Sequence, residues 1–135
     1  MAYKIAEIEG IGRSYGSKLS KAGITTTSDL LKHCGSANGR RQVAATCGVD
    51  EKQLLKWANM ADLMRIRGIG KQFSELLEAA GVDTVKELRT RRADNLASKM
   101  KELNAKKKRT RATPSERQVA SWIDQAKSMD GMITH

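Results

Sequence analysis

A five-residue segment occurs twice in the chain, 58 residues apart, and this repeat constrains the fold more than any other feature of the sequence. Residues 8–12 read Ile-Glu-Gly-Ile-Gly, and residues 66–70 read Ile-Arg-Gly-Ile-Gly. The same offset aligns Ala-Gly-Ile at 22–24 with Ala-Gly-Val at 80–82. A repeat that persists at one offset predicts two copies of the same supersecondary unit.

Each copy places Gly-Ile-Gly between two helical patterns, and this combination predicts a sharp reversal of the chain. Glycine tolerates a positive φ angle, and the isoleucine between the glycines can point into the core. The amides that open the following helix then face outward, where they favour an anion such as phosphate. The candidate phosphate ligands, including the basic residue after the second glycine, are Gly10, Ile11, Gly12 and Arg13 in the first copy and Gly68, Ile69, Gly70 and Lys71 in the second.

Both copies resemble the helix-hairpin-helix motif of DNA repair, recombination and polymerase proteins. That motif has apolar residues five and two positions before its first glycine and a small residue four positions after its second. The chain is also similar to uncharacterised bacterial proteins, grouped as a domain of unknown function, that carry paired units of this kind. The flanking motif positions hold Ile5, Ile8 and Gly16 in the first copy and Leu63, Ile66 and Ser74 in the second.

The resemblance implies an all-α fold with a SAM-domain-like helical architecture, and the composition agrees with it. The chain has one proline and no alternating β-branched runs, and with 4% aromatic residues its core should be aliphatic. A length of 135 residues fits one domain, or two small units that share a core. We expect two tandem helix-hairpin-helix repeats fused into one compact helical domain: a first unit at 1–61, a second at 62–130 with a basic loop at 105–112, and a frayed tail at 131–135.

The apolar periodicity predicts a helix on each side of both Gly-Ile-Gly segments and several more between them. The helix after Asp50 should run into the second repeat and serve as its leading helix. Caps are predicted at Thr26 or Thr27, Asp50, Asp83 or Thr84, and Thr113, and residues 35–39 should form a loop. The expected helices are 1–9, 13–22, 28–32, 40–47, 51–66, 71–80, 85–91, 94–103 and 114–126.

Basic residues are unevenly distributed and favour an acidic partner. The formal net charge is +10, and residues 89–111 contain ten bases but only two acids. Such a concentration indicates nucleic acid before a membrane surface, although a merely solvated surface is the alternative. A run within this stretch is either a phosphate-binding arm or a solvated interhelical loop. Its bases are Lys106, Lys107, Lys108, Arg109 and Arg111.

The two Gly-Ile-Gly loops differ in the charges around them. Glu7 and Glu9 flank the first loop and should repel a phosphate, whereas Arg65, Arg67 and Lys71 flank the second and should attract one. We therefore expect the second loop to be the main phosphate anchor.

Aromatic residues lie at helical spacing on apolar stripes, which favours core packing over base stacking. Trp57 and Trp122 occupy matching stripes, and Tyr15 matches Phe73 at the repeat offset. We expect all four to be core residues.

No pattern indicates an enzyme, a cofactor or a metal site. Cys34 and Cys47 are not in a ligand spacing, and the two histidines stand apart from any catalytic group. No apolar run is long enough to span a bilayer, so we expect a soluble, cytoplasmic, bacterial protein. The predicted function is non-enzymatic binding of nucleic acid, chiefly duplex DNA, through its backbone. The alternatives are a protein-interaction module that docks an acidic partner and, more weakly, a structural RNA partner.

Overall fold

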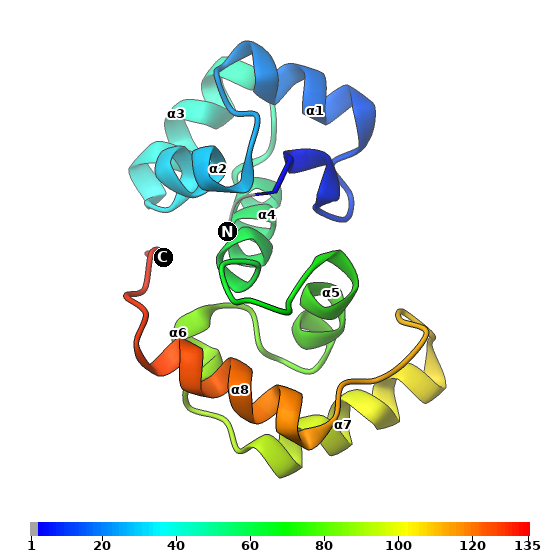
Figure 1. Cartoon of the computed structure of the whole chain (residues 1–135). Coiled ribbons are helices and arrows are strands. Elements are labelled where there is room, and N and C mark those ends of the chain that lie inside the picture. The colour runs from blue at the N-terminus through cyan, green and yellow to red at the C-terminus, as the bar shows by residue number, and fades with distance from the viewer. Residues whose placement is uncertain (1–2) are drawn as a thin grey trace.

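The computed structural model describes residues 3–135, and in that range the chain is helical, without a β-strand. An isolated antiparallel bridge pairs Lys4 with Thr26. Two groups of helices lie one above the other and are joined by α4 (Figure 1). The elements are the 3-10 helix η1 (Ile5–Glu7) and the α-helices α1 (Gly12–Lys21), α2 (Thr27–Cys34), α3 (Ala37–Cys47), α4 (Glu51–Leu63), α5 (Lys71–Ala79), α6 (Val85–Leu88), α7 (Ala93–Lys106) and α8 (Glu116–Lys127).

Each group of helices has its own cluster of buried side chains. The first cluster is drawn from residues between Ile5 and Met64, and the second from residues between Leu63 and Ala126. Both are mainly aliphatic, as the composition predicted. Because α4 contributes Trp57 to the first cluster and Leu63 to the second, this helix fixes the two groups to each other.

The sequence repeat is also a repeat of backbone hydrogen bonds. We call residues 8–12 loop one and residues 66–70 loop two. In each loop the second isoleucine amide donates to the carbonyl of the isoleucine three residues earlier, at 3.3 Å in loop one and 3.1 Å in loop two. The helix after each loop ends before a glycine with a positive φ, +82° at Gly23 and +90° at Gly81. The two copies therefore share these hydrogen bonds and the glycine after the helix, but they differ at the second loop glycine. Gly12 has a φ of +60° and is the first residue of α1, whereas Gly70 has a φ of −110° and precedes α5.

The element before each loop differs between the copies, and one prediction here was wrong. Loop two follows the 13-residue helix α4, as expected, whereas the described part of the expected helix at 1–9 contains only η1; residues 1 and 2 lie outside the described range. The chain before η1 is extended because it pairs with the start of α2. Thr27 N donates to Tyr3 O at 2.8 Å, beside the Lys4–Thr26 bridge. Backbone groups in this pairing are not available for helical turns.

Polar side chains cap several helices where the sequence predicted caps. Thr26, Asp50 and Thr84 each accept a hydrogen bond from an amide in the first turn of the helix that follows. The cap predicted at Thr113 was wrong. Ser115 caps α8 and forms a capping box with Gln118, because Pro114 is buried ahead of the helix and does not enter its first turn.

Helices α2, α3 and α7 are longer than predicted. Ser36 accepts a hydrogen bond from Gly39 N at 3.0 Å and starts α3 inside the segment 35–39, which was expected to be a loop. Helix α7 continues through residue 106, so its last turn includes the first base of the basic run.

The C-terminal segment contacts the first group of helices. Residues 131–135 were expected to fray, but the backbone of Thr134 is hydrogen bonded. The buried side chain of Arg40 donates to Thr134 O at 2.5 Å, and Thr134 N donates to Gly35 O at 2.8 Å. Ile133 packs against the first core. The segment thus runs from the end of α8 back to α2 and α3 (Figure 1).

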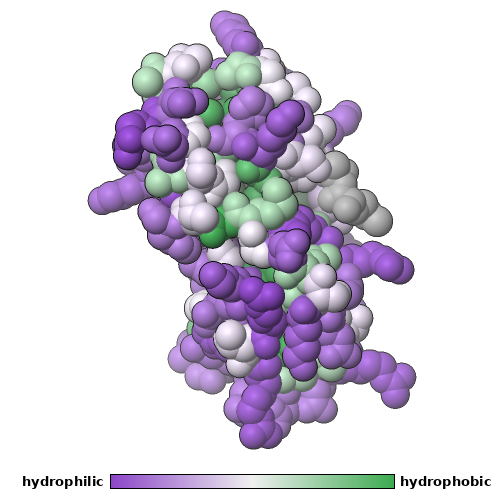
Figure 2. All heavy atoms as spheres, turned by 90° about the vertical axis from the view of Figure 1, so that its left-hand side faces the viewer, coloured by the Kyte–Doolittle hydropathy of each residue, from purple (hydrophilic) through white to green (hydrophobic). Residues whose placement is uncertain are grey.

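Hydrophilic side chains cover most of the face that carries α2, α3 and the C-terminal segment, with hydrophobic areas interspersed (Figure 2). Over the described residues, only Tyr15 and Met132 are large hydrophobic side chains with substantial exposure. None of the helices in this range has both the length and the apolar composition needed to cross a membrane.

Candidate nucleic-acid interface

Both loops bury their central isoleucine and expose their glycines, as the sequence predicted. Ile11 and Ile69 are each 1% exposed or less, whereas Gly10, Gly12 and Gly68 lie on the surface. Gly10 and Gly68 adopt φ angles of +95° and +102°, a region that disfavours any side chain. The isoleucines anchor each reversal while the glycines leave the backbone accessible.

The outer amides of both loops are unoccupied. Within residues 3–135, no hydrogen bond uses the amides of Gly10 and Gly12 in loop one, or those of Gly68, Gly70 and Lys71 in loop two. The last of these opens α5, whose first-turn N–H groups have no intrahelical partner. Each loop can therefore offer several backbone donors to an anion.

A tryptophan lies beneath each loop and fixes the space available to it. A Cβ atom added at Gly10 would lie 3.5 Å from Trp57 Nε1, and one added at Gly68 would lie 2.8 Å from Trp122 Nε1. The indoles are at most 2% exposed, which confirms the prediction that both are core residues.

Each indole also contacts one of the two aromatic residues that match at the repeat offset. The Tyr15 and Trp57 ring centroids are 5.0 Å apart, and those of Phe73 and Trp122 are 5.3 Å apart. Tyr15 remains 38% exposed and Phe73 is half-buried, so both lie at the edge of the core and not inside it.

The basic residues around loop two have different roles. Arg67 projects an exposed side chain, and its backbone is clamped by Gln125 of α8: Arg67 N donates to Gln125 Oε1 at 2.9 Å, and Gln125 Nε2 donates to Arg67 O at 3.2 Å. Arg65 is half-buried, with its guanidinium 2.6 Å from the buried carboxylate of Asp62. The guanidinium of this candidate phosphate ligand is therefore already engaged in a structural ion pair.

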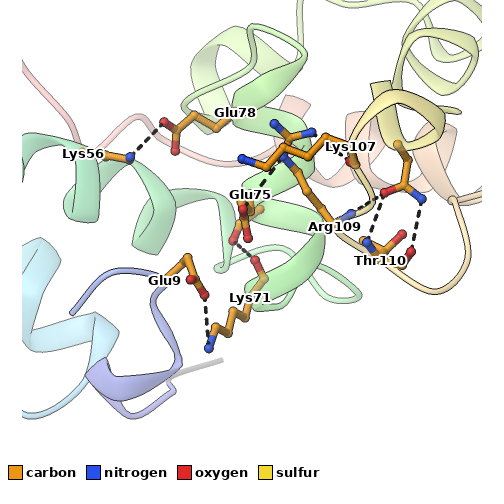
Figure 3. Close-up of polar contacts among 10 residues, drawn as sticks. Glu9, Lys56, Lys71, Glu75, Glu78, Lys107, Arg109 and Thr110 are labelled. Carbon is orange, nitrogen blue, oxygen red and sulfur yellow. Dashed lines mark hydrogen bonds and ion pairs between the residues drawn. The ribbon is translucent and has the colours of Figure 1, made fainter. Parts of the chain in front are cut away.

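Lys71, the basic residue after loop two, is paired with a carboxylate of loop one. Its Nζ lies 3.2 Å from Glu9 Oε2, and Figure 3 shows the two side chains pointing toward each other from neighbouring elements. The sequence predicts opposite effects of these two residues on a phosphate, and the structure places them in contact. In contrast, no described carboxylate forms an ion pair with Arg13 or Arg67.

The basic run forms a folded turn in which residues 106–108 and Arg111 are exposed and Arg109 is half-buried. Asn104 Oδ1 accepts hydrogen bonds from Arg109 N (2.7 Å) and Thr110 N (3.1 Å), and Asn104 Nδ2 donates to Thr110 O at 3.2 Å. Thr110 is 4% exposed. The Arg109 guanidinium turns inward, 3.9 Å from Glu75, and Lys106 pairs with Glu102. Lys106 stays exposed in this pair, and the exposed bases of the run that form no ion pair among the described residues are Lys107, Lys108 and Arg111.

A cleft of about 300 Å³ lies where loop one, α4, α5 and the basic turn meet. Charged side chains of both signs line it: Glu9, Glu75 and Glu78, and Lys56, Lys107 and Arg109. Burial is the main cause that raises the pKa of Glu78 above its usual value, and Lys56 at 3.9 Å partly offsets this effect. Figure 3 shows these side chains extending from loop one, α4, α5 and the basic turn.

Outside the loops, the titratable groups point to structural roles. Both cysteines are free, and burial raises the pKa of the Cys34 thiol to about 11, so this thiol stays protonated at neutral pH. Over residues 3–135 no three His, Cys, Asp or Glu side chains gather in a way that could hold a metal ion.

Sequence reasoning missed three residues that shape this region: Asp62, Asn104 and Gln125. Asp62 and Gln125 lie on helices that carry several other polar residues, so nothing in their immediate sequence distinguishes them. Asn104 comes directly before the basic run, a position typical of a side chain that closes a turn.

No curated protein and no solved structure matches the chain. A family model described as a domain of unknown function, DUF4332, matches residues 9–129, and the chain therefore belongs to that family.

Proposed function

We propose that the chain binds the phosphate backbone of nucleic acid, in the first place duplex DNA, without catalysis and without strong sequence preference. In this proposal loops one and two are the turns of two tandem helix-hairpin-helix units. The observation that carries it is loop two. Among residues 3–135, the amides of Gly68, Gly70 and Lys71 have no acceptor, and no carboxylate forms an ion pair with the neighbouring Arg67. Unpaired amides with an adjacent cation are a suitable receptor for phosphate.

Loop two is the better receptor of the two. Loop one has unoccupied amides at Gly10 and Gly12, but the exposed carboxylates of Glu7 and Glu9 flank it. Like charges a few ångströms apart near a protein surface repel each other by about 1 kcal/mol or more before salt screening. We infer that loop two provides the main phosphate contact.

The basic turn supplies a second contact in this proposal. Lys107, Lys108 and Arg111 are exposed on a turn whose backbone is held by Asn104, so they can meet a phosphate without ordering a flexible arm. Contacts of this kind add affinity and salt dependence but do not discriminate between nucleic-acid sequences. Replacing these three bases with glutamine should reduce the steepness of the salt dependence.

Charge reversal at the two loops tests the proposal. We expect Arg67→Glu to weaken binding to a fluorescent duplex by about tenfold at low salt and to reduce the slope of log K against log salt by about one. Arg13→Glu should have a smaller effect, and Lys32→Glu, an exposed base on α2, serves as the matched control. Equal losses for Arg67→Glu and Arg13→Glu would contradict the assignment of loop two as the anchor.

The competing proposal is docking of an acidic protein, and competition experiments separate the two. Unlabelled duplex DNA should displace the labelled duplex at far lower concentration than polyglutamate of equal charge. Parallel measurements with single-stranded DNA and with duplex RNA report which nucleic acid is preferred. Binding that polyglutamate abolishes as effectively as DNA, or binding that does not depend on salt, would argue against a phosphate-backbone receptor.

A further inference from the structure

An ion pair between Glu9 and Lys71 joins the two loops. The first of these residues is expected to repel a phosphate and the second to attract one. Glu9 follows the first isoleucine of loop one, and Lys71 is the first residue of α5, directly after loop two. Their charged atoms are 3.2 Å apart, and the side chains are 51% and 44% exposed. The pair is therefore a surface ion pair that a competing anion can reach.

The same pattern is repeated around the adjacent cleft. Each of the three carboxylates that line the cleft faces a base within 4 Å: Glu9 faces Lys71, Glu75 faces Arg109 and Glu78 faces Lys56. Two of these bases, Lys71 and Arg109, are candidate phosphate ligands. The carboxylates of this cleft thus neutralise cations that the proposed function would use (Figure 3).

We propose that Glu9 is a built-in competitor for the phosphate at Lys71, so that loop one tunes the affinity of loop two and does not add an equal phosphate contact of its own. This inference rests on the proposed function. In the free protein the Glu9 carboxylate forms an ion pair with the ammonium group of Lys71. A phosphate that binds the amides of loop two must exchange with this carboxylate to reach the same cation. Glu9 thereby selects for polyanions dense enough in charge to displace it.

A neutral substitution of Glu9 tests this role, and the chain provides a matched control. Glu9→Gln should raise duplex affinity by about two- to fivefold at low salt, the range expected for an exposed ion pair. Glu7→Gln removes the same charge two residues earlier, from a side chain that is exposed and makes no ion pair among the described residues. Its gain should be smaller. Because salt screens the Glu9–Lys71 pair, the advantage of Glu9→Gln should shrink as salt rises.

A double substitution shows whether the effect passes through Lys71. In a Lys71→Gln background, Glu9→Gln should give no more gain than Glu7→Gln does. Thermal denaturation of each variant verifies that the fold is retained. If the unmodified protein binds duplex and Glu9→Gln gains no more than Glu7→Gln, the competitor role is wrong while the proposed function stands. If neither the unmodified protein nor Glu9→Gln binds, the proposed function fails and this inference fails with it.

Discussion

The two halves of the molecule carry different charges around loops of similar sequence. Loops one and two share a buried isoleucine, a positive-φ glycine and a tryptophan beneath that glycine. Loop one has Glu7 and Glu9 at its start and Arg13 after it, whereas the charges around loop two, Arg65, Arg67 and Lys71, are all basic. The comparison teaches that the scaffold depends on glycine, isoleucine and tryptophan, whereas the charge of each loop can vary independently because it lies on exposed side chains.

The halves also differ at the first amide of α2 in the first half and of α6 in the second half. The first amide of α2, Thr27 N, donates to a backbone carbonyl, that of Tyr3, whereas the first amide of α6, Val85 N, donates to the carboxylate of Asp62 at 2.8 Å. A backbone acceptor cannot be removed by substitution, but a side-chain acceptor can. The second half therefore depends on one buried carboxylate where the first half does not.

The largest expected effect follows from this difference. Asp62 is fully buried and also holds Arg65, so Asp62→Ala leaves an unpaired cation and an unpaired helix amide. We expect a loss of about 3–5 kcal/mol in the free energy of unfolding, measured by urea denaturation. Thr27→Val, which removes the acceptor for Tyr3 N, should cost only about 1 kcal/mol. Similar losses for both variants would show that the two helix starts are equivalent.

An intermediate effect should separate the two loop glycines. An alanine at either position must adopt a φ near +100°, at a cost of about 1–2 kcal/mol. At Gly68 the new Cβ would also lie 2.8 Å from Trp122 Nε1, against an ordinary 3.5 Å contact at Gly10. Crowding of this kind adds about 1–3 kcal/mol, so Gly68→Ala should be clearly less stable than Gly10→Ala in thermal and urea denaturation. The reverse order would contradict the tighter packing beneath loop two.

The smallest expected effect concerns the caps of α2 and α6. Thr26 and Asp29 form a capping box, and hydrogen bonds from Thr25 and Thr26 lower the pKa of the Asp29 carboxyl. In α6 the corresponding residue, Glu87, accepts instead from Arg91. Because the folded pKa of Asp29 lies below its unfolded value, its contribution is present above the unfolded pKa and is lost as pH falls through the folded pKa.

Asp29→Asn should therefore be less stable than the unmodified protein at pH 7, with the difference disappearing in acid. Urea denaturation at a series of pH values measures this, and Glu87→Gln is the comparison for the second half. A stability difference for Asp29→Asn that is unchanged from pH 7 to pH 3 would argue against the titration of the capping box.

Much of the fold could be predicted from the sequence because local signals agreed with one another. The offset of 58 predicted the repeat, the caps Thr26, Asp50 and Thr84 were visible as side-chain chemistry, and the stripes around Trp57 and Trp122 indicated the core. Membership of a family of unknown function was also expected. Each of these depends on residues close together in the chain, or on a pattern that recurs along it.

The contacts that position the candidate site were not predictable in the same way. Glu9 meets Lys71 across 62 residues, and Arg67 meets Gln125 across 58, because loop one and α8 both pack near loop two. Local periodicity does not indicate which surfaces meet. The helix expected at 1–9 was predicted too long for the same reason, because Lys4 forms an extended pairing with the distant residue Thr26.

The most direct test of the central claim is a residue-resolved titration of the labelled protein with duplex DNA, followed by amide ¹H–¹⁵N chemical shifts. The account predicts that the amides of Gly68, Gly70 and Lys71 shift first and most, that those of Gly10 and Gly12 shift less, and that the shifts weaken as salt is raised. Shifts confined to surfaces away from loop two, or shifts of equal size in both loops at every salt concentration, would contradict it.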